Sequence, residues 1–152
     1  MKNLILIMLV LVGLTFSDAY IDTTSSGTYI KAFSPEGGIG LITLDKELTA
    51  FVTAIQPEKN NNGVLILLIK NSSDYDDSQL FELTYASKIT DEDGTMMFLY
   101  DITNDYGLIN MMKRLPELDI LILNEPYGGD DGIWGQTIST FGYKQLYKQL
   151  YE

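Results

Sequence analysis

The chemistry open to this chain is limited first by what it lacks, because its 152 residues include no cysteine and no histidine. The missing thiol excludes thiol–disulfide exchange, and the missing imidazole removes the commonest general base and metal ligand. Carboxylates gather in three segments, 74–77, 91–93 and 130–131. Such clusters can bind Ca²⁺ weakly or supply the acid–base pair of a hydrolase. None fits an EF-hand loop, so we expect solvated turns, with no metal site and no cofactor.

The segment from Asn71 to Ser78 is the main candidate site, because hydroxyl, carboxylate and phenol groups follow one another there. Serine and aspartate are favoured at helix N-caps, so the plainest interpretation is that they cap a helix. The triplet Asn71-Ser72-Ser73 is also a sequon, with Asn71 as the glycosylation acceptor. A glycan on Asn71 would cover any groove at this segment, so the groove and the glycan are competing hypotheses.

The charge of the chain limits its partners. Its 10 lysines and arginines stand against 21 aspartates and glutamates, which gives a formal net charge of −11 at pH 7. No basic stripe is present to displace counterions from phosphates, so we expect neither nucleic acid nor an anionic membrane surface as a partner. The length suits one domain, and 45% apolar residues argue against a disordered chain.

The N-terminus has the features of a signal peptide. A short basic start precedes an apolar run over 4–16, and small residues at Ser17 and Ala19 suit cleavage before Tyr20. The alternative is a signal anchor that stays attached. No later segment is long and apolar enough to span a membrane. We expect a leader (1–19), an N-terminal arm with an edge strand (20–37) and a main domain (38–152), located in the secretory pathway, in the endoplasmic reticulum lumen or alternatively secreted or periplasmic.

Hydrophobic periodicity predicts strands that alternate with helices. An i, i+3, i+4, i+7 stripe that begins at Leu48 predicts a first helix, and residues 80–86 predict a second. Two further helices are expected, one capped by Asn104 or Asp105 and the last capped by Ser139 or Thr140. This alternation predicts an α/β fold with a mostly parallel central sheet. The predicted strands are 28–33, 39–44, 64–69 (central, buried on both faces), 95–102, 118–123 and 133–138, of which the last two form an antiparallel edge hairpin.

This order of elements resembles the thioredoxin fold over roughly 38–152. Residues 64–69 are similar to the central strand of that family, and 70–76 take the place of its active-site loop. Ser73 and Asp76 stand where the two cysteines would be, and Pro116 resembles the cis-proline that faces the loop. The resemblance implies an α/β three-layer sandwich, with a mixed central sheet and helices on both faces. Without the two thiols, such a protein is redox-inactive.

In that fold the loop and the proline form one groove, and the resemblance implies that the groove binds extended polypeptide. Free amides at the helix start would favour peptide carbonyl groups there. The expected peptide-binding residues are Ser72, Ser73, Asp74, Tyr75, Asp76, Leu115 and Pro116.

The leader, the strand over 38–44 and the strand over 98–102 resemble the lumenal domain of thioredoxin-like oligosaccharyltransferase subunits, or a thiol-less protein-disulfide-isomerase-like protein. This resemblance implies a protein that is not an enzyme, binds polypeptide or a partner subunit, and assists N-glycosylation in association with oligosaccharyltransferase. The alternative is an acidic secreted or periplasmic binding domain unrelated to thioredoxin and stabilised by calcium. A hydrolase with paired carboxylates is a third hypothesis.

Overall fold

The computed structural model describes residues 18–25, 27–54, 64–90, 94, 96–103, 105–123 and 134–152. Most of the predicted signal peptide and two of the three carboxylate clusters, 91–93 and 130–131, lie outside these described residues. In the part of the chain that is described, no helix has the length and apolar character needed to cross a membrane.

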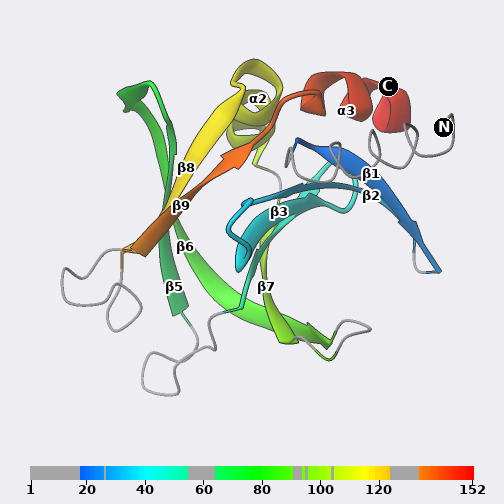
Figure 1. The fold of residues 1–152 in the computed structure, drawn as a ribbon, viewed down its shortest axis with the longest axis horizontal. Coiled ribbons are helices and arrows are strands. Elements are labelled where there is room, and N and C mark those ends of the chain that lie inside the picture. The colour runs from blue at the N-terminus through cyan, green and yellow to red at the C-terminus, as the bar shows by residue number, and fades with distance from the viewer. Residues whose placement is uncertain are drawn as a thin grey trace, which may run out of the picture.

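The described residues form one nine-stranded sheet in which all neighbouring strands are antiparallel (Figure 1). The spatial order of the strands is β1-β2-β3-β4-β7-β6-β5-β8-β9. The strands are β1 (Tyr20–Thr24), β2 (Gly27–Phe33), β3 (Ile39–Thr43), β4 (Leu48–Thr53), β5 (Val64–Asn71), β6 (Asp74–Thr90), β7 (Met96–Thr103), β8 (Glu117–Ile122) and β9 (Trp134–Ser139), and the helices are α2 (Tyr106–Arg114) and α3 (Tyr143–Tyr151).

The expected α/β thioredoxin-like sandwich is therefore wrong. The helix predicted from Leu48 is strand β4, and the helix predicted over 80–86 lies within strand β6. In β6 the buried residues are Phe81 and Leu83, two positions apart, while Leu80 is exposed. This period of two is that of a strand with one face inward, and it outweighs the helical spacing of the leucines. The βαβ crossovers predicted through those two helices are therefore absent, and the paired strands around them are antiparallel.

Several other predictions are confirmed. β2, β3, β7, β8 and β9 fall on predicted strands, and β8 pairs with β9 as an antiparallel hairpin at one edge of the sheet. β5 is also a strand, but its burial alternates, so only one face points inward. Asp105 caps α2 as predicted, whereas α3 starts at Gly142 without a side-chain cap. The expected arm over 20–37 carries β1 and β2 and belongs to the same sheet.

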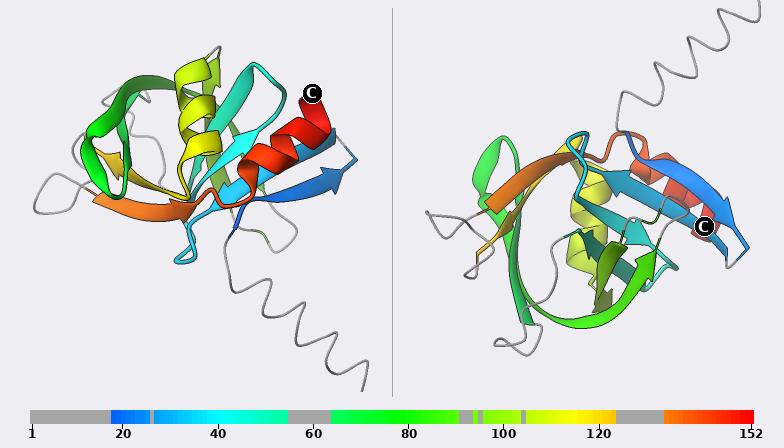
Figure 2. Two further views of the ribbon diagram at one scale, coloured as in Figure 1. Left: turned by 90° about the horizontal axis from the view of Figure 1, so that it is seen from above. Right: turned by 60° about the horizontal axis from the view of Figure 1, so that its bottom comes forward.

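The sheet is strongly curved, because the long strand β6 takes part in both of its halves. β6 pairs with β5 along its first part and with β7 along its last part. The concave side encloses α2 (Figure 2), whose Leu108, Ile109 and Met112 are buried in the core. β9 comes near β2, so the two ends of the sheet approach each other.

Helix α3 is attached through its tyrosines. The hydroxyl of the buried Tyr143 lies 2.7 Å from Oγ1 of Thr43 at the end of β3. The hydroxyl of Tyr147 donates to the carbonyl of Lys46 at 3.2 Å, and that of Tyr151 donates to the carbonyl of Thr43 at 3.3 Å. These contacts attach α3 to the end of the curved sheet at which α2 also lies (Figure 1).

Candidate functional site

Strands β6 and β7 separate beside the start of α2. β6 pairs with β5 up to Thr84, but it pairs with β7 only from Tyr85 onwards. Among the described residues, the side of β6 that faces β7 has no strand partner over 74–84. β7 runs on along β4 to Thr103, and the chain then enters α2 at Tyr106. The first turn of α2 consequently lies across from the unpaired edge of β6.

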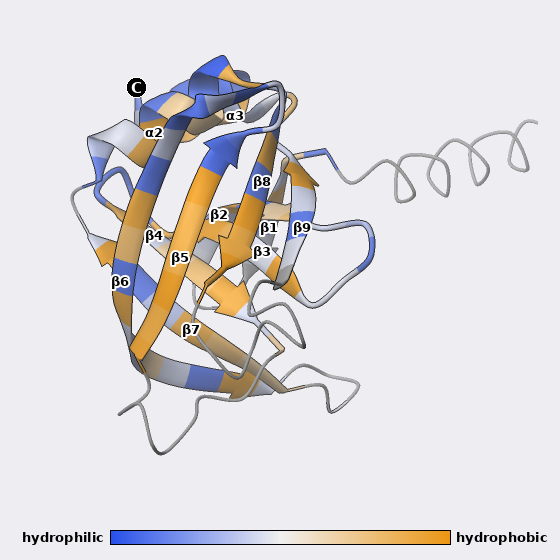
Figure 3. Ribbon diagram, turned by 90° about the vertical axis from the view of Figure 1, so that its left-hand side faces the viewer, coloured by the Kyte–Doolittle hydropathy of each residue, from blue (hydrophilic) through white to orange (hydrophobic). Residues whose placement is uncertain are grey.

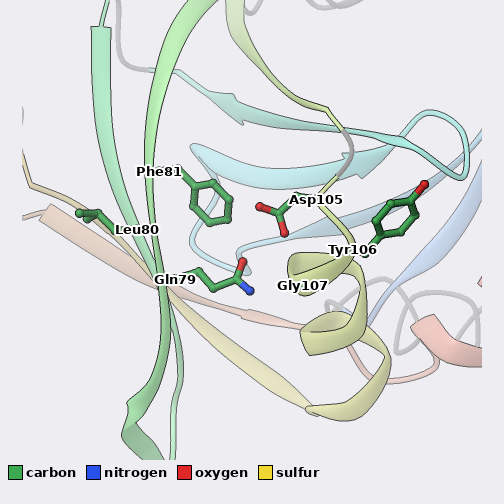
Figure 4. Close-up of a pocket in the computed structure, with 6 residues that line it drawn as sticks. All are labelled: Gln79, Leu80, Phe81, Asp105, Tyr106 and Gly107. Carbon is green, nitrogen blue, oxygen red and sulfur yellow. The ribbon is translucent and has the colours of Figure 1, made fainter.

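A hollow of about 590 Å³ opens between this edge and the helix. Figure 4 shows the side chains of Gln79, Phe81 and Asp105 directed toward one another. Leu80 points to the opposite side of β6 and is 66% exposed, as strand alternation requires. We call this hollow the β6–α2 pocket; its lining residues are Gln79, Leu80, Phe81, Asp105, Tyr106 and Gly107.

The glycine at position 107 allows the strand and the helix to come this close. A Cβ atom on Gly107 would lie 2.1 Å from Nε2 of Gln79 and 3.1 Å from Oδ1 of Asp105. The Gln79 amide is packed against the first turn of α2, and its Oε1 is buried without a hydrogen-bond partner among the described residues. An unpaired buried acceptor costs about 1–3 kcal/mol of stability. Oε1 of Gln136 and Oγ1 of Thr49 are unpaired too, but neither residue lines this pocket.

Asp105 supplies the charge of the β6–α2 pocket. Its Oδ1 accepts a hydrogen bond from the backbone amide of Leu108 at 2.8 Å, which caps α2. A helix start carries roughly half a positive charge. A whole carboxylate charge exceeds that half charge, so the pocket is negative on balance. Its lining combines the carboxylate of Asp105, the amide of Gln79, which can both donate and accept, and the rings of Phe81 and Tyr106.

The segment predicted as the binding site forms a β-hairpin. Ser72 and Ser73 make the turn between β5 and β6, and residues 74–76 begin β6. The backbone amide of Ser73 donates to Oδ1 of Asn71 at 2.9 Å, so the sequon side chain helps to close the turn. No helix starts here, which makes the expected role of helix amides in a groove wrong.

A polar cluster lies beside this hairpin, on the outer side of β5, β8 and β9. Lys70 is only 4% exposed; its Nζ lies 3.0 Å from Oδ2 of Asp119 and 3.5 Å from the ring centre of Tyr75. Asp119 also accepts hydrogen bonds from Ser72 at 2.9 Å and from Thr137 at 2.6 Å. Figure 3 shows β5 hydrophobic along its length until its hydrophilic C-terminal end. We call these five residues the Lys70–Asp119 cluster.

The carboxylate of this cluster is held in its ionised form. Burial pushes the pKa of Asp119 upward, but the hydrogen bonds from Thr137, Lys70 and Ser72 outweigh burial and hold that pKa below its usual range. Of the predicted peptide-binding residues, Ser72 and Tyr75 are thus engaged within the protein. The cluster connects β5, β8 and β9, and the ammonium of Lys70 and the carboxylate of Asp119 already have partners within the protein.

Leu115 and Pro116 connect α2 to β8, and they lie near the hairpin because β8 pairs with β5 directly after the proline. Arg114 adds a second link through an ion pair of 2.8 Å with Asp77. Leu115 is buried in the core, whereas Pro116 is exposed. Both residues line a smaller hollow of about 180 Å³ next to α3. The two predicted segments, 72–76 and 115–116, therefore lie close together, but they do so within an all-antiparallel sheet.

The carboxylates show no metal site in the part of the chain that the structure describes, where no three acidic side chains converge as ligands. Of the three sequence clusters, only 74–77 falls there. Within this segment, Asp77 forms an ion pair with Arg114, and the hydrogen bond from Arg114 lowers the pKa of the Asp77 carboxyl.

Sequence reasoning missed the residues of the β6–α2 pocket and most of the Lys70–Asp119 cluster. Asp105 was recognised only as a candidate helix cap, Phe81 was assigned to a helix, and Gln79 was assigned to no element. One signal for the cluster was present: Lys70 ends one apolar run and Asp119 interrupts another. Opposite charges at such positions suggest neighbouring strands whose side chains pair on one face.

Comparisons with known proteins add no relative to this picture. No protein-family model matches the chain, and neither a curated protein nor a solved structure matches it. The geometry of the site is therefore the basis for a functional hypothesis.

Proposed function

We propose that this protein is a non-catalytic domain that binds an extended polypeptide segment along the unpaired edge of β6. The observation that carries this proposal is the separation of β6 from β7, which leaves residues 74–84 without a strand partner on that side, next to an open pocket. Main-chain hydrogen bonds from such an edge give affinity for an added strand with little sequence preference.

An open edge of this length is uncommon on a natural sheet. Proteins usually cover strand edges or block them with charges and prolines, because a free edge pairs with other chains. Here the pocket side of the edge presents Gln79 and Phe81, and the described part of the chain places no strand over it. Helix α2 contacts this edge at Gln79 through its first turn and at Asp77 through Arg114. An incoming strand would satisfy the backbone groups of β6 and place alternate side chains into the pocket.

Two further features support binding rather than catalysis. The β6–α2 pocket contains no thiol and no imidazole, and its one carboxylate serves as the cap of α2. The chain's signal peptide, predicted over 1–19, would deliver the domain to the secretory pathway, where it would meet unfolded or partner polypeptides.

The test is selection of peptides from a display library of random extended sequences, followed by hydrogen exchange of the purified complex. We expect selected peptides to slow exchange of the backbone amides over 79–84. Slowed exchange only at other strand edges, or no selected peptide at all, would overturn the proposal.

A pair of substitutions on β6 gives a second readout. Gln79→Trp fills the β6–α2 pocket and should abolish peptide binding, whereas Glu82→Trp places the same ring at an exposed position of β6 outside the pocket lining and should leave binding intact. Equal binding by both variants would contradict the proposed site. If Gln79→Trp fails to fold, the hydrogen-exchange pattern of the unchanged protein still decides the question.

A further inference from the structure

The chemistry of the β6–α2 pocket is that of a receptor for a hydrogen-bond donor. Oε1 of Gln79 is buried and has no hydrogen-bond partner in the part of the chain that the structure describes, and the carboxylate of Asp105 lies beside it (Figure 4). Gly107 keeps the Gln79 amide pressed against α2, since any larger residue would collide with its Nε2. The two side chains thus converge as acceptors on one small volume.

An aromatic wall completes this arrangement. The ring of Phe81 lies next to the carboxylate of Asp105 in Figure 4 and is largely buried. Aromatic rings attract cations and also pack well against methylene chains. A long side chain with a cationic tip can therefore place its stem along Phe81 and its charge between Gln79 and Asp105.

The negative charge of the β6–α2 pocket favours a positively charged ligand. The carboxylate of Asp105 exceeds the roughly half positive charge of the helix start. The whole chain carries a net charge of −11, which attracts basic partners from a distance and repels acidic ones. An anionic side chain would meet Asp105 directly and is disfavoured.

We propose that the β6–α2 pocket binds the basic side chain, lysine or arginine, of the polypeptide segment that the domain holds; this specificity rests on the proposed function above. An ammonium or guanidinium group would donate to Oε1 of Gln79 and to the carboxylate of Asp105. Charged hydrogen bonds of this kind are stronger than neutral ones, so one basic residue would fix the register of the bound strand.

The first experiment uses a small probe that does not need the edge of β6. N-acetyl-lysine methylamide is titrated into the protein and followed by NMR, with N-acetyl-norleucine methylamide as the uncharged match. We expect saturable shifts at the Gln79 side-chain amide and at the Gly107 backbone amide with the lysine probe alone. Equal shifts with both probes, or none with either, would overturn the inference.

Two substitutions locate the effect. Asp105→Asn removes the charge but keeps a good helix cap, so α2 should stay intact while lysine-probe affinity falls about tenfold or more. Asp101→Asn removes an exposed carboxylate on β7 outside the pocket and should change affinity less than twofold, apart from general screening. The same loss in both variants would show attraction to net charge only and would contradict a defined site.

The second experiment separates this inference from the proposed function. Library-selected peptides are compared with versions in which each lysine or arginine is replaced by norleucine. A loss of about tenfold or more for one basic position supports the inference. Selected peptides without any such dependence would overturn the inference and leave edge binding standing. Lysine-probe binding without any selected peptide would overturn edge binding and leave the basic-side-chain pocket standing.

Discussion

Two polar sites of this protein differ in how completely their groups are paired. In the Lys70–Asp119 cluster, the nearly buried ammonium faces a carboxylate and an aromatic ring, and the carboxylate also receives two hydroxyl groups. In the β6–α2 pocket, the buried Oε1 of Gln79 has no partner beside an open hollow. The first site is complete within the protein, and the second lacks a donor.

Under the proposed function, this difference separates a site that stabilises the fold from a site that binds a ligand. A satisfied buried network adds rigidity and joins neighbouring strands, because removing any member leaves another unpaired. An unsatisfied acceptor lowers stability, and a ligand that donates a hydrogen bond to it would recover part of that loss. The predictions below test this contrast through stability and binding together.

The largest effect is expected for Asp119→Ala. This change leaves the ammonium of Lys70 buried without a counterion, and losing one partner of such a pair costs about 3 kcal/mol. Urea denaturation of the purified protein measures this loss. The double variant Lys70→Met/Asp119→Leu should recover most of it, since apolar residues of similar size replace a buried pair at little cost. A loss below about 1 kcal/mol for Asp119→Ala would show that the pair is solvated.

The same carboxylate should make stability depend on acid pH. Asp119 has a pKa below the ordinary 3.8, so the unfolded chain binds its proton more readily than the folded one. Its contribution is complete above the unfolded value and is lost as pH falls below about 4 through the folded value. Denaturation at several pH values should show a steeper acid loss for the wild type than for Asp119→Asn. Parallel curves for the two proteins would contradict this assignment.

A smaller effect of opposite sign is expected for Gln79→Leu. Removing the unpaired Oε1 should raise stability by about 1 kcal/mol, because an unsatisfied acceptor is replaced by an apolar group. Thermal denaturation measures the gain. Gln136→Leu is the matched control, because its Oε1 is also unpaired but lies outside the pocket; it should gain similar stability and keep lysine-probe binding, which Gln79→Leu should lose. Probe binding unchanged in both variants would remove the distinction between the two glutamines.

The smallest change in stability is expected for Gly107→Ala. A Cβ atom must displace the flexible end of the Gln79 side chain, while alanine in a helix gains roughly 0.5–1 kcal/mol over glycine. The two effects should nearly cancel in a denaturation curve. Probe affinity should still fall, since the displaced amide occupies the pocket. Wild-type affinity in this variant would mean that the Gln79 amide does not contribute to binding.

The sequence predicted the positions of strands better than it predicted which strands pair with one another. Residues 28–33, 118–123 and 133–138 were recognised because they are short, apolar and bounded by turn residues, all of which are local features. Residues 80–86 were misread because Leu80 and Leu83 satisfy a helical spacing while Phe81 and Leu83 satisfy a strand spacing. Only the pairing of β6 with β5 decides between the two, and pairing is not a local property.

The candidate site shows the same limit. Asp105 as a helix cap was predictable, because a capping side chain acts on amides three residues away. Its approach to Gln79 was not predictable, since 26 positions of chain separate Gln79 from Asp105 and nothing local in either segment indicates the contact. The predicted groove was based on a helix start, and the structure has a β-hairpin at that segment, because the strand pairing of β5 with β6 is not a local property.

By itself, the sequence determined the absence of thiol and imidazole chemistry, the acidic charge and the positions of most strands, because composition and short-range periodicity depend on neighbouring residues alone. The tertiary structure decided the antiparallel order of the strands, the separation of β6 from β7 and the meeting of Gln79 with Asp105. These features depend on which distant segments bury one another's apolar faces, and many pairings are compatible with the same local pattern.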